Sequence, residues 1–289
     1  MPMKFSRQEI ERVHGKTVVM TGATGGLGEA MCRYLLAFGA DLIMVTRNKE
    51  KSKRLCDTLL REYPGAKVRY LLCDLSSMDQ VKAVSQQLQQ LPVDILMLNA
   101  GAYDLPRVLT TEGYDNVFAI NFLSHYYLTK TLLPLLKARK GKVTVTGSIA
   151  HRFQELDPQN PDFSRHQGAN NIYGNSKRFL MFALMELLKD SGVEYSIGHP
   201  GISYTGITAN YPPEVLKIVK PSMLFLFMHK EEACLSILRA VLTDVPYCHW
   251  IGPGYFDIWG NPVITPLHSC SLRERRQIFT IAEKMFRTL

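Results

Sequence analysis

The sequence lacks the features that mark membrane, secreted or fibrous proteins. No apolar run approaches the roughly 18 residues that a membrane-spanning helix needs, and no internal repeat or low-complexity tract is present. The six cysteines form no Cys-x-x-Cys pair, which predicts reduced and mostly buried thiols rather than a disulfide framework. The segment before residue 15 is mixed and charged, without the apolar core of a secretion signal. We therefore expect a cytoplasmic protein.

Two kinds of binding site are also missing from the sequence. The formal net charge is +8, but the basic residues are spread along the chain and are not interleaved with stacking aromatics. This distribution favours a solvated surface that attracts an anionic cofactor over a nucleic-acid interface. The histidines His125, His151 and His199 show no metal-ligand spacing with a carboxylate, so we predict no metal site.

What the sequence does contain is an alternation of short apolar runs with amphipathic segments of helical length. At 289 residues and 46% hydrophobic content, the chain suits a single α/β domain over 1–289. Strands are expected at 17–21, 41–46, 67–73, 95–99, 142–147, 195–199 and 247–251, and helices at 26–38, 49–63, 78–88, 113–137, 173–190, 230–243 and 271–287. About seven strands with helical crossovers predict a Rossmann-type, doubly wound parallel sheet. Its ligands should bind beyond the carboxyl ends of the strands.

The first strand ends in a glycine-rich turn, Thr-Gly-Ala-Thr-Gly-Gly-Leu-Gly at 21–28. Glycines let the backbone turn tightly and approach a pyrophosphate, while the N–H groups and dipole of the following helix favour its negative charge. Gly22, Gly26 and Gly28 follow Gly-x-x-x-Gly-x-Gly rather than the commoner Gly-x-Gly-x-x-Gly. The alternative is a glycine-rich turn without a ligand.

The residues after the second strand bear on which dinucleotide would bind. An acidic residue there would favour NAD through the ribose hydroxyls, but the sequence has Thr46 followed by Arg47. A guanidinium suits a 2′-phosphate through fork-shaped, charge-assisted hydrogen bonds. We therefore favour NADP(H) over NAD(H). The alternative is an arginine on a solvated loop.

Three Tyr-x-x-x-Lys pairs occur, and their positions distinguish them. The first, at 63 and 67, crosses a Pro-Gly turn, so its side chains share no helical face. The pair at 126 and 130 precedes the fifth strand. Tyr173 and Lys177 open the helix that follows this strand and its Ser148. Residues i and i+4 are neighbours on a helix, so we expect Lys177 to lower the pKa of the Tyr173 phenol and make it a usable general acid or base.

These motifs, with Asn121 before the fifth strand and Pro200-Gly201 after the sixth, resemble the short-chain dehydrogenase/reductase family over about residues 15–245. The resemblance implies that Tyr173 exchanges a proton with the substrate oxygen and that Ser148 donates a second hydrogen bond to it. It also implies that Lys177 holds the nicotinamide ribose and that Asn121 orders a water chain to Lys177. The implied cofactor contacts are Gly22, Thr24, Gly26, Leu27, Gly28, Arg47, Asp74, Leu75, Asn99, Ala100, Gly101, Tyr173, Lys177, Pro200, Gly201, Ile202 and Thr205. For Asn99 and Gly101, support of the central strand is an equally good explanation.

A polar insert at 153–171 separates Ser148 from Tyr173 and resembles that of the retinol-dehydrogenase-like branch of the family. The resemblance implies a lipophilic aldehyde, ketone or alcohol as substrate. Segment 204–229 stands where the family places a substrate lid, and its apolar run at 223–228 fits a lipophilic pocket. A core or dimer-contact helix is an equal alternative. To the tail, 250–289, the sequence assigns only packing.

The predicted function is that of an NADP-dependent oxidoreductase, a carbonyl reductase or alcohol dehydrogenase. One alternative is a non-catalytic protein that senses NADP, although the Tyr and Lys that such a protein would lose are both present. Another is an epimerase or dehydratase of the same fold, which would need a different glycine spacing and a longer C-terminal domain. The resemblance also implies a homodimer or homotetramer formed through helices 113–137 and 173–190.

Overall fold

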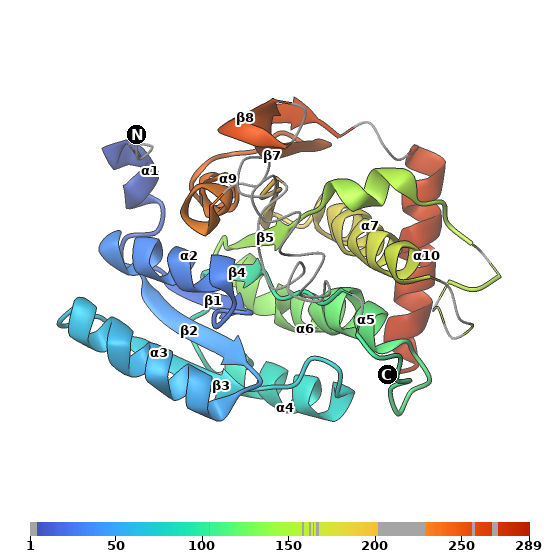
Figure 1. Cartoon of the computed structure of the whole chain (residues 1–289), viewed down its shortest axis with the longest axis horizontal. Helices are drawn as coiled ribbons and strands as arrows, with labels where there is room; N and C mark the ends of the chain where they lie inside the picture. Colours follow the sequence, from blue (N-terminus) through green and yellow to red (C-terminus); the bar gives the residue numbers. More distant parts are fainter. Residues whose placement is uncertain are drawn as a thin grey trace, which may run out of the picture.

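A computed structural model describes residues 5–103, 105–157, 159–161, 163, 165, 168–201, 229–255, 258–267 and 271–289. It confirms the doubly wound α/β fold. The sheet has the order β3-β2-β1-β4-β5-β6-β7-β8 (Figure 1). Neighbouring strands are parallel from β3 to β7, and β8 runs antiparallel to β7. The strands are β1 (Thr17–Thr21), β2 (Asp41–Thr46), β3 (Val68–Leu72), β4 (Ile95–Leu98), β5 (Lys142–Thr146), β6 (Glu194–Gly198), β7 (His249–Tyr255) and β8 (Trp259–Pro266).

Helices cover both faces of the sheet. The described helices are α1 (Arg7–Glu11), α2 (Gly26–Ala37), α3 (Lys49–Glu62), α4 (Met78–Gln89), α5 (Asn116–Phe118), the π-helix η1 (Ala119–Leu123), α6 (Ser124–Ala138), the 3-10 helix η2 (Ile149–Phe153), α7 (Ala169–Leu188), α9 (Lys230–Leu242) and α10 (Leu272–Arg287). One apolar cluster joins α4, α6, α7 and α10 to the sheet, and the other joins α2, α3 and α9 (Figure 1). Successive residues of β1 alternate between them, with Val19 in the first and Val18 and Met20 in the second. This alternation explains why β1, β2 and β4 have continuous apolar runs.

The strand β8 was not predicted, because its sequence contains Gly260, Pro262 and Pro266. Proline has no N–H to donate and is excluded from the interior of a sheet, but an edge strand tolerates it. β8 is such an edge, and its Pro262 pairs with Pro253 of β7. The tail that was expected only to pack therefore extends the sheet.

The predicted helix at 113–137 is divided in three, with the π-helix η1 between α5 and α6. All five residues of η1 are buried. One of them is the candidate catalytic residue Asn121, which therefore lies in the widened turn. The helix predicted at 173–190 begins earlier, at Ala169, and so takes in the end of the polar insert.

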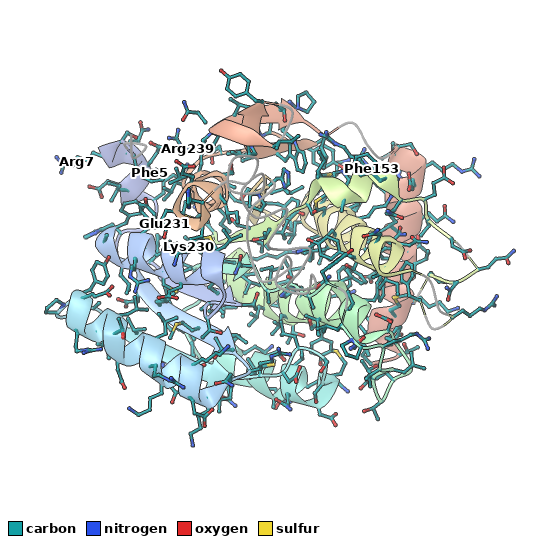
Figure 2. The ribbon with its side chains drawn as sticks, viewed as in Figure 1. Phe5, Arg7, Phe153, Lys230, Glu231 and Arg239 are labelled. Atoms are coloured by element: carbon teal, nitrogen blue, oxygen red, sulfur yellow. The ribbon has the colours of Figure 1, made fainter. Side chains whose placement is uncertain are left out.

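The two ends of the described chain pack onto the domain at different places. At the N-terminal end, Arg239 of α9 lies over the Phe5 ring, 5.5 Å from its centre, and pairs with Glu9 of α1 at 3.0 Å (Figure 2). At the C-terminal end, α10 packs against α7 and α6 (Figure 1). No helix in the described parts is long and apolar enough to cross a membrane.

Candidate active site

The glycine turn between β1 and α2 depends on two of its glycines for its own geometry. Gly22 has φ +70°, and a Cβ there would lie 2.7 Å from Cα of Ala100. A Cβ on Gly28 would lie 2.2 Å from the carbonyl oxygen of Gly22. Gly26 differs, because nothing lies within 4 Å of its Cβ position. Since Gly26 is exposed in the first turn of α2, its missing side chain leaves room for a ligand at the helix N-terminus.

Beside this turn, a cleft is lined by Thr24 of the turn and by Lys51, Arg54, Leu55 and Thr58 of α3, together with Glu29 of α2. Arg47, exposed at the end of β2, lies just before α3. In the described part of the chain, no ion pair involves Arg47, Lys51 or Arg54. Lys53, which directly precedes Arg54, does pair with Asp57.

The segment after β3 is held by local hydrogen bonds. Asp74 Oδ1 accepts from the backbone N–H and the hydroxyl of Ser76, at 2.9 and 2.7 Å. The N–H of Asp74 donates to the side chain of Gln80. Leu75 is buried in the first apolar cluster, whereas Leu27 of the glycine turn packs against the second. Asp74 and Leu75, two of the implied cofactor contacts, therefore lie on an ordered turn directly after β3.

The side chain of Asn99, directly after β4, forms hydrogen bonds within the protein. Its Nδ2 donates to the carbonyls of Thr21 and Gly22, both at 3.3 Å, and its Oδ1 accepts from Thr146 at 3.1 Å. These bonds tie together the ends of β1, β4 and β5. Of the two explanations that the sequence left open for Asn99, the geometry favours structural support.

The four candidate catalytic residues come from three neighbouring elements. Asn121 lies in η1, Ser148 caps η2 directly after β5, and Tyr173 and Lys177 lie one turn apart on α7. Tyr173 and Ser148 share a side-chain hydrogen bond. The Nζ of Lys177 donates to the carbonyl of Thr146 at 3.1 Å and lies 6.0 Å from the centre of the Tyr173 ring.

Asn121 and Lys177 meet at the loop that follows β4. The side chain of Asn121 accepts from the N–H of Ala102 at 2.7 Å and donates to its carbonyl at 2.9 Å. Its Nδ2 also donates to Ser176, which precedes Lys177 on α7. A Cβ on Gly101 would lie 3.2 Å from Nζ of Lys177 and 3.5 Å from Oδ1 of Asn121. Gly101 thus allows both polar groups to approach the loop backbone.

The electrostatics differ from the prediction in one respect. Burial raises the pKa of Tyr173, and the hydrogen bond with Ser148 opposes this rise. The prediction that Lys177 lowers the pKa of Tyr173 was wrong for this structure. The Lys177 ammonium is hydrogen-bonded to the carbonyl of Thr146 and lies 6.0 Å from the centre of the phenol ring. Burial instead lowers the pKa of Lys177 itself to about 8.

The other two Tyr-x-x-x-Lys pairs lie away from these residues. Tyr126 and Lys130 both bind Glu283 of α10. Lys67 pairs with Asp41 at 3.1 Å, at the opposite end of β2 from Arg47.

The segment after β6 is described only at its start. Gly201 has φ +76° and follows Pro200, so the chain turns sharply there. The preceding His199 donates its N–H to Ile251 of β7, and its ring stacks on Trp250 with centres 4.8 Å apart. Ile202, Thr205 and the predicted lid up to residue 228 lie outside the described residues. His229, the last residue of that segment, caps α9.

Sequence reasoning missed two contributions to the site. Thr21 and His125 form a hydrogen bond with each other and further hydrogen bonds with the residues around them. The only sequence signal was their position, since Thr21 precedes Gly22 and His125 lies one helical turn after Asn121. Tyr103 packs edge-on against Tyr173, with ring centres 5.3 Å apart, and its hydroxyl donates to Asn170 at 2.6 Å. No short motif contains this second tyrosine.

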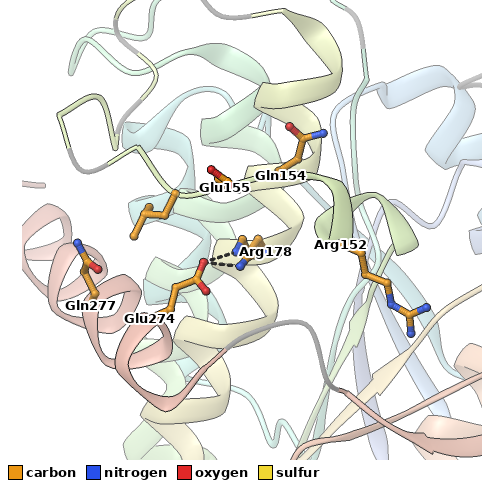
Figure 3. Close-up of a pocket in the computed structure, with 7 residues that line it drawn as sticks. Arg152, Gln154, Glu155, Arg178, Glu274 and Gln277 are labelled. Carbon is orange, nitrogen blue, oxygen red and sulfur yellow. Dashed lines mark hydrogen bonds and ion pairs between the residues drawn. The ribbon is translucent and has the colours of Figure 1, made fainter.

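A polar cavity of about 490 Å³ lies between η2, α7 and α10 (Figure 3). Its lining residues are Arg152, Gln154, Glu155, Leu156, Arg178, Glu274 and Gln277. Buried Arg178 binds Glu274 and also donates to the carbonyl of His151 at 2.7 Å. This cavity is too polar for a lipophilic substrate, but its ion pair connects α10 to α7, the helix that carries Tyr173 and Lys177.

Comparisons with known proteins identify the family of this chain. A family model described as short chain dehydrogenase matches residues 16–215. Human retinol dehydrogenase 14 is 32% identical over 259 residues, which cover 81% of this chain and 76% of that protein. Human polyprenol dehydrogenase is 28% identical over 204 residues, which cover 66% of this chain and 62% of that protein.

Solved structures share the fold. A crystal structure of an uncharacterized protein from Mycobacterium paratuberculosis superposes with a TM-score of 0.76 over 96% of this chain and 97% of that chain, at 23% identity. A short-chain dehydrogenase from Sphingobium yanoikuyae in complex with NADPH has a TM-score of 0.57 and 25% identity, over 76% of this chain and 81% of that one.

Proposed function

The chain belongs to the short-chain dehydrogenase family, and from this premise we propose that it is an NADP-dependent oxidoreductase interconverting a carbonyl and an alcohol. The observation that carries the proposal is the meeting of four groups. Ser148 is bonded to Tyr173, Lys177 lies one helical turn from Tyr173, and Asn121 and Lys177 face the same loop. These are the groups that proton transfer to a substrate oxygen requires.

The residues present fit a dinucleotide. The turn between β1 and α2 leaves open space at Gly26, where a pyrophosphate would meet the free N–H groups of the helix. Arg47, Lys51 and Arg54 support NADP over NAD, because three cations without ion pairs among the described residues lie at or near the cleft beside Thr24. A 2′-phosphate is the anion that such a group of cations suits.

The reaction follows from the protonation states of the chain's own groups. A bound nicotinamide would supply hydride to the carbonyl carbon or accept it from the alcohol. Tyr173 keeps its proton at neutral pH because burial raises its pKa, so it can donate this proton to the oxygen of a carbonyl substrate. Ser148 donates a hydrogen bond to the same oxygen and stabilises its developing charge. The raised pKa keeps Tyr173 in the protonated form that acts as the acid in carbonyl reduction.

A lipophilic substrate is supported by two relatives, which are named for retinol and polyprenol. Both names describe long apolar alcohols. The polar cavity beside α10 does not suit such a molecule, so we place the substrate next to Tyr173, where Tyr103 adds an aromatic ring. A panel of retinoid, polyprenoid and steroid carbonyls, assayed with NADPH, tests this class.

The assignment of the proton donor is tested by Tyr173→Phe. We expect carbonyl reduction to fall at least about a hundredfold, the lower range for a lost general acid, while NADPH binding changes little. Tyr126→Phe is the matched control, because Tyr126 belongs to the Tyr-x-x-x-Lys pair that binds Glu283. It should lower stability but leave turnover intact. Retained turnover in Tyr173→Phe would refute the assignment.

We also propose a cytoplasmic location and, on the resemblance, a homodimer or homotetramer. α10 already packs against both α6 and α7, so an interface built on these helices must include α10 as well. Sedimentation velocity of the purified chain tests the assembly, and fractionation of cells that express it tests the location. A monomer or a membrane-bound pool would contradict the corresponding part of the proposal.

A further inference from the structure

A buried histidine that the proposed reaction does not use joins two sides of the active site. His125 lies in the first turn of α6 and is fully buried. Its Nδ1 is 3.1 Å from the carbonyl oxygen of Asn121, and its Nε2 is 3.0 Å from the hydroxyl of Thr21. Thr21 ends β1 directly before the glycine turn. The imidazole therefore bridges the cofactor-binding turn and the π-helix that carries Asn121.

The two contacts determine which ring nitrogen carries the proton. A carbonyl oxygen can only accept, so Nδ1 of His125 donates to Asn121. Nε2 is then an acceptor and takes the hydroxyl proton of Thr21. The other acceptor within reach of that hydroxyl, the carbonyl of Met97, is farther away at 3.5 Å. Burial, assisted by the charge of Lys177, lowers the pKa of His125 to about 3, so the ring stays neutral at physiological pH.

Once the proton of Thr21 points to His125, its oxygen is free to accept. The N–H groups of Asn99 and Ala100 both donate to it at 3.0 Å. These two residues begin the loop that follows β4. The N–H and carbonyl of Ala102, farther along the loop, bind the side chain of Asn121.

The hydrogen bonds thus form a closed circuit. It runs from Thr21 through the loop to Ala102, then to Asn121, to His125 and back to Thr21. Gly101 stands within the loop segment that the circuit holds, against the ammonium of Lys177. Moving any one member would move the loop on which Asn121 and Lys177 converge.

We propose that His125 is a positioning residue, which holds Asn121 and the loop 99–102 in register with Lys177. The proposal rests on the proposed function for its catalytic consequence. Without the imidazole, the carbonyl of Asn121 would lose a partner in a buried place. The hydroxyl of Thr21 would be left with the longer contact to the carbonyl of Met97, at 3.5 Å.

Three substitutions separate the two hydrogen bonds. His125→Phe removes both. His125→Asn can place an amide nitrogen near the position of Nδ1 and keep the bond to Asn121, and His125→Gln can place an oxygen near Nε2 and keep the acceptor for Thr21. We expect kcat to fall about tenfold or more in the Phe variant, with a smaller change in the Kd of NADPH, and to recover in part in the Asn variant. Ser124→Ala is the control, since it removes a buried hydrogen bond to Ile120 on the same helix.

Two measurements do not depend on turnover. Hydrogen exchange at the amides of Asn99 and Ala100 should become faster in His125→Phe and stay unchanged in Ser124→Ala. In the wild-type protein, the ¹⁵N chemical shifts of His125 should show the Nδ1–H form and no titration between pH 5 and 8. If no carbonyl were reduced by the wild type, the proposed function would fail, but these readouts would still decide the role of His125. An Nε2–H tautomer, or a Phe variant that matches Ser124→Ala in kcat and exchange, would overturn the inference.

Discussion

At the scale of single residues, Tyr173 and Lys177 are affected by burial in opposite ways. The phenol is neutral when protonated, so burial raises its pKa, whereas the ammonium is charged when protonated, so burial lowers its pKa to about 8. Between these two values, the pair consists of a protonated tyrosine and a neutral lysine. As the pH rises, Lys177 therefore loses its proton before Tyr173 does.

This order predicts an alkaline limb in the activity. We expect kcat/KM for NADPH, which reports groups of the free enzyme, to fall above about pH 8 as Lys177 loses its proton. Lys177→Arg should remove this limb up to about pH 10, even if its plateau is lower, because a guanidinium stays protonated there. An unchanged limb in the arginine variant would show that another group titrates.

The titration of Lys177 does not lower activity by unfolding the protein, because its effect on the free energy of unfolding has the opposite sign. Its pKa in the folded state lies below the value of about 10.4 expected for an unfolded chain. Between the two values the unfolded state binds more protons, so this group makes folding more favourable as pH rises from about 8. Thermal unfolding measured at pH 7.5 and 9 would separate the two effects.

Single residues also show what the sequence could not predict about the site. Tyr173, Lys177 and Ser148 were predicted because each belongs to a motif at a strand end or helix start, and Asn121 was predicted from the family resemblance. The bond between Thr21 and His125 joins residues 104 positions apart, and nothing local marks it. The pKa of Tyr173 was mispredicted for the same reason. Helical spacing brings Lys177 near, but only the fold shows that its ammonium is bonded to Thr146.

At the scale of elements, short apolar runs identified seven strands because a strand covered on both faces is mostly apolar. The same reasoning failed for β8, whose prolines are allowed only because it lies at the edge. It also failed to separate η1 from α6, since a π-turn changes the hydrogen-bond partners of the backbone without interrupting the apolar pattern.

The C-terminal helix α10 is expected to belong to the cooperative core. Its Ile278 is fully buried in the same cluster as the residues of α7. Ile278→Ala should lower the free energy of unfolding by about 2–5 kcal/mol, measured by urea denaturation. The exposed Thr280 on the same helix provides the control, and Thr280→Ala should change it by about 0.5 kcal/mol or less. Equal effects of the two substitutions would mean that α10 is not part of the folding unit.

At the scale of the whole molecule, the proposed cofactor site lies where the two halves of the sheet meet. β1 and β4 are adjacent in the centre, and the chain leaves β1 to build β2 and β3 on one side and returns to build β4 to β8 on the other. Thr21, Asn99 and the glycine turn are all at this junction. A ligand that binds there contacts both halves, so its binding free energy stabilises the folded domain as a unit.

NADPH should therefore raise the midpoint of thermal unfolding, and NADH should raise it less. At a hundredfold excess over Kd, binding adds about 2.7 kcal/mol, which corresponds to a shift of about 5 °C or more for a domain of this size. Arg47→Ala should reduce the shift with NADPH and leave that with NADH unchanged, because only NADPH carries the 2′-phosphate. Lys53→Ala is the matched control, since Lys53 is exposed on α3 and already paired with Asp57. Equal shifts with both cofactors, or an equal loss of both in Arg47→Ala, would contradict a role for Arg47 in selecting NADP.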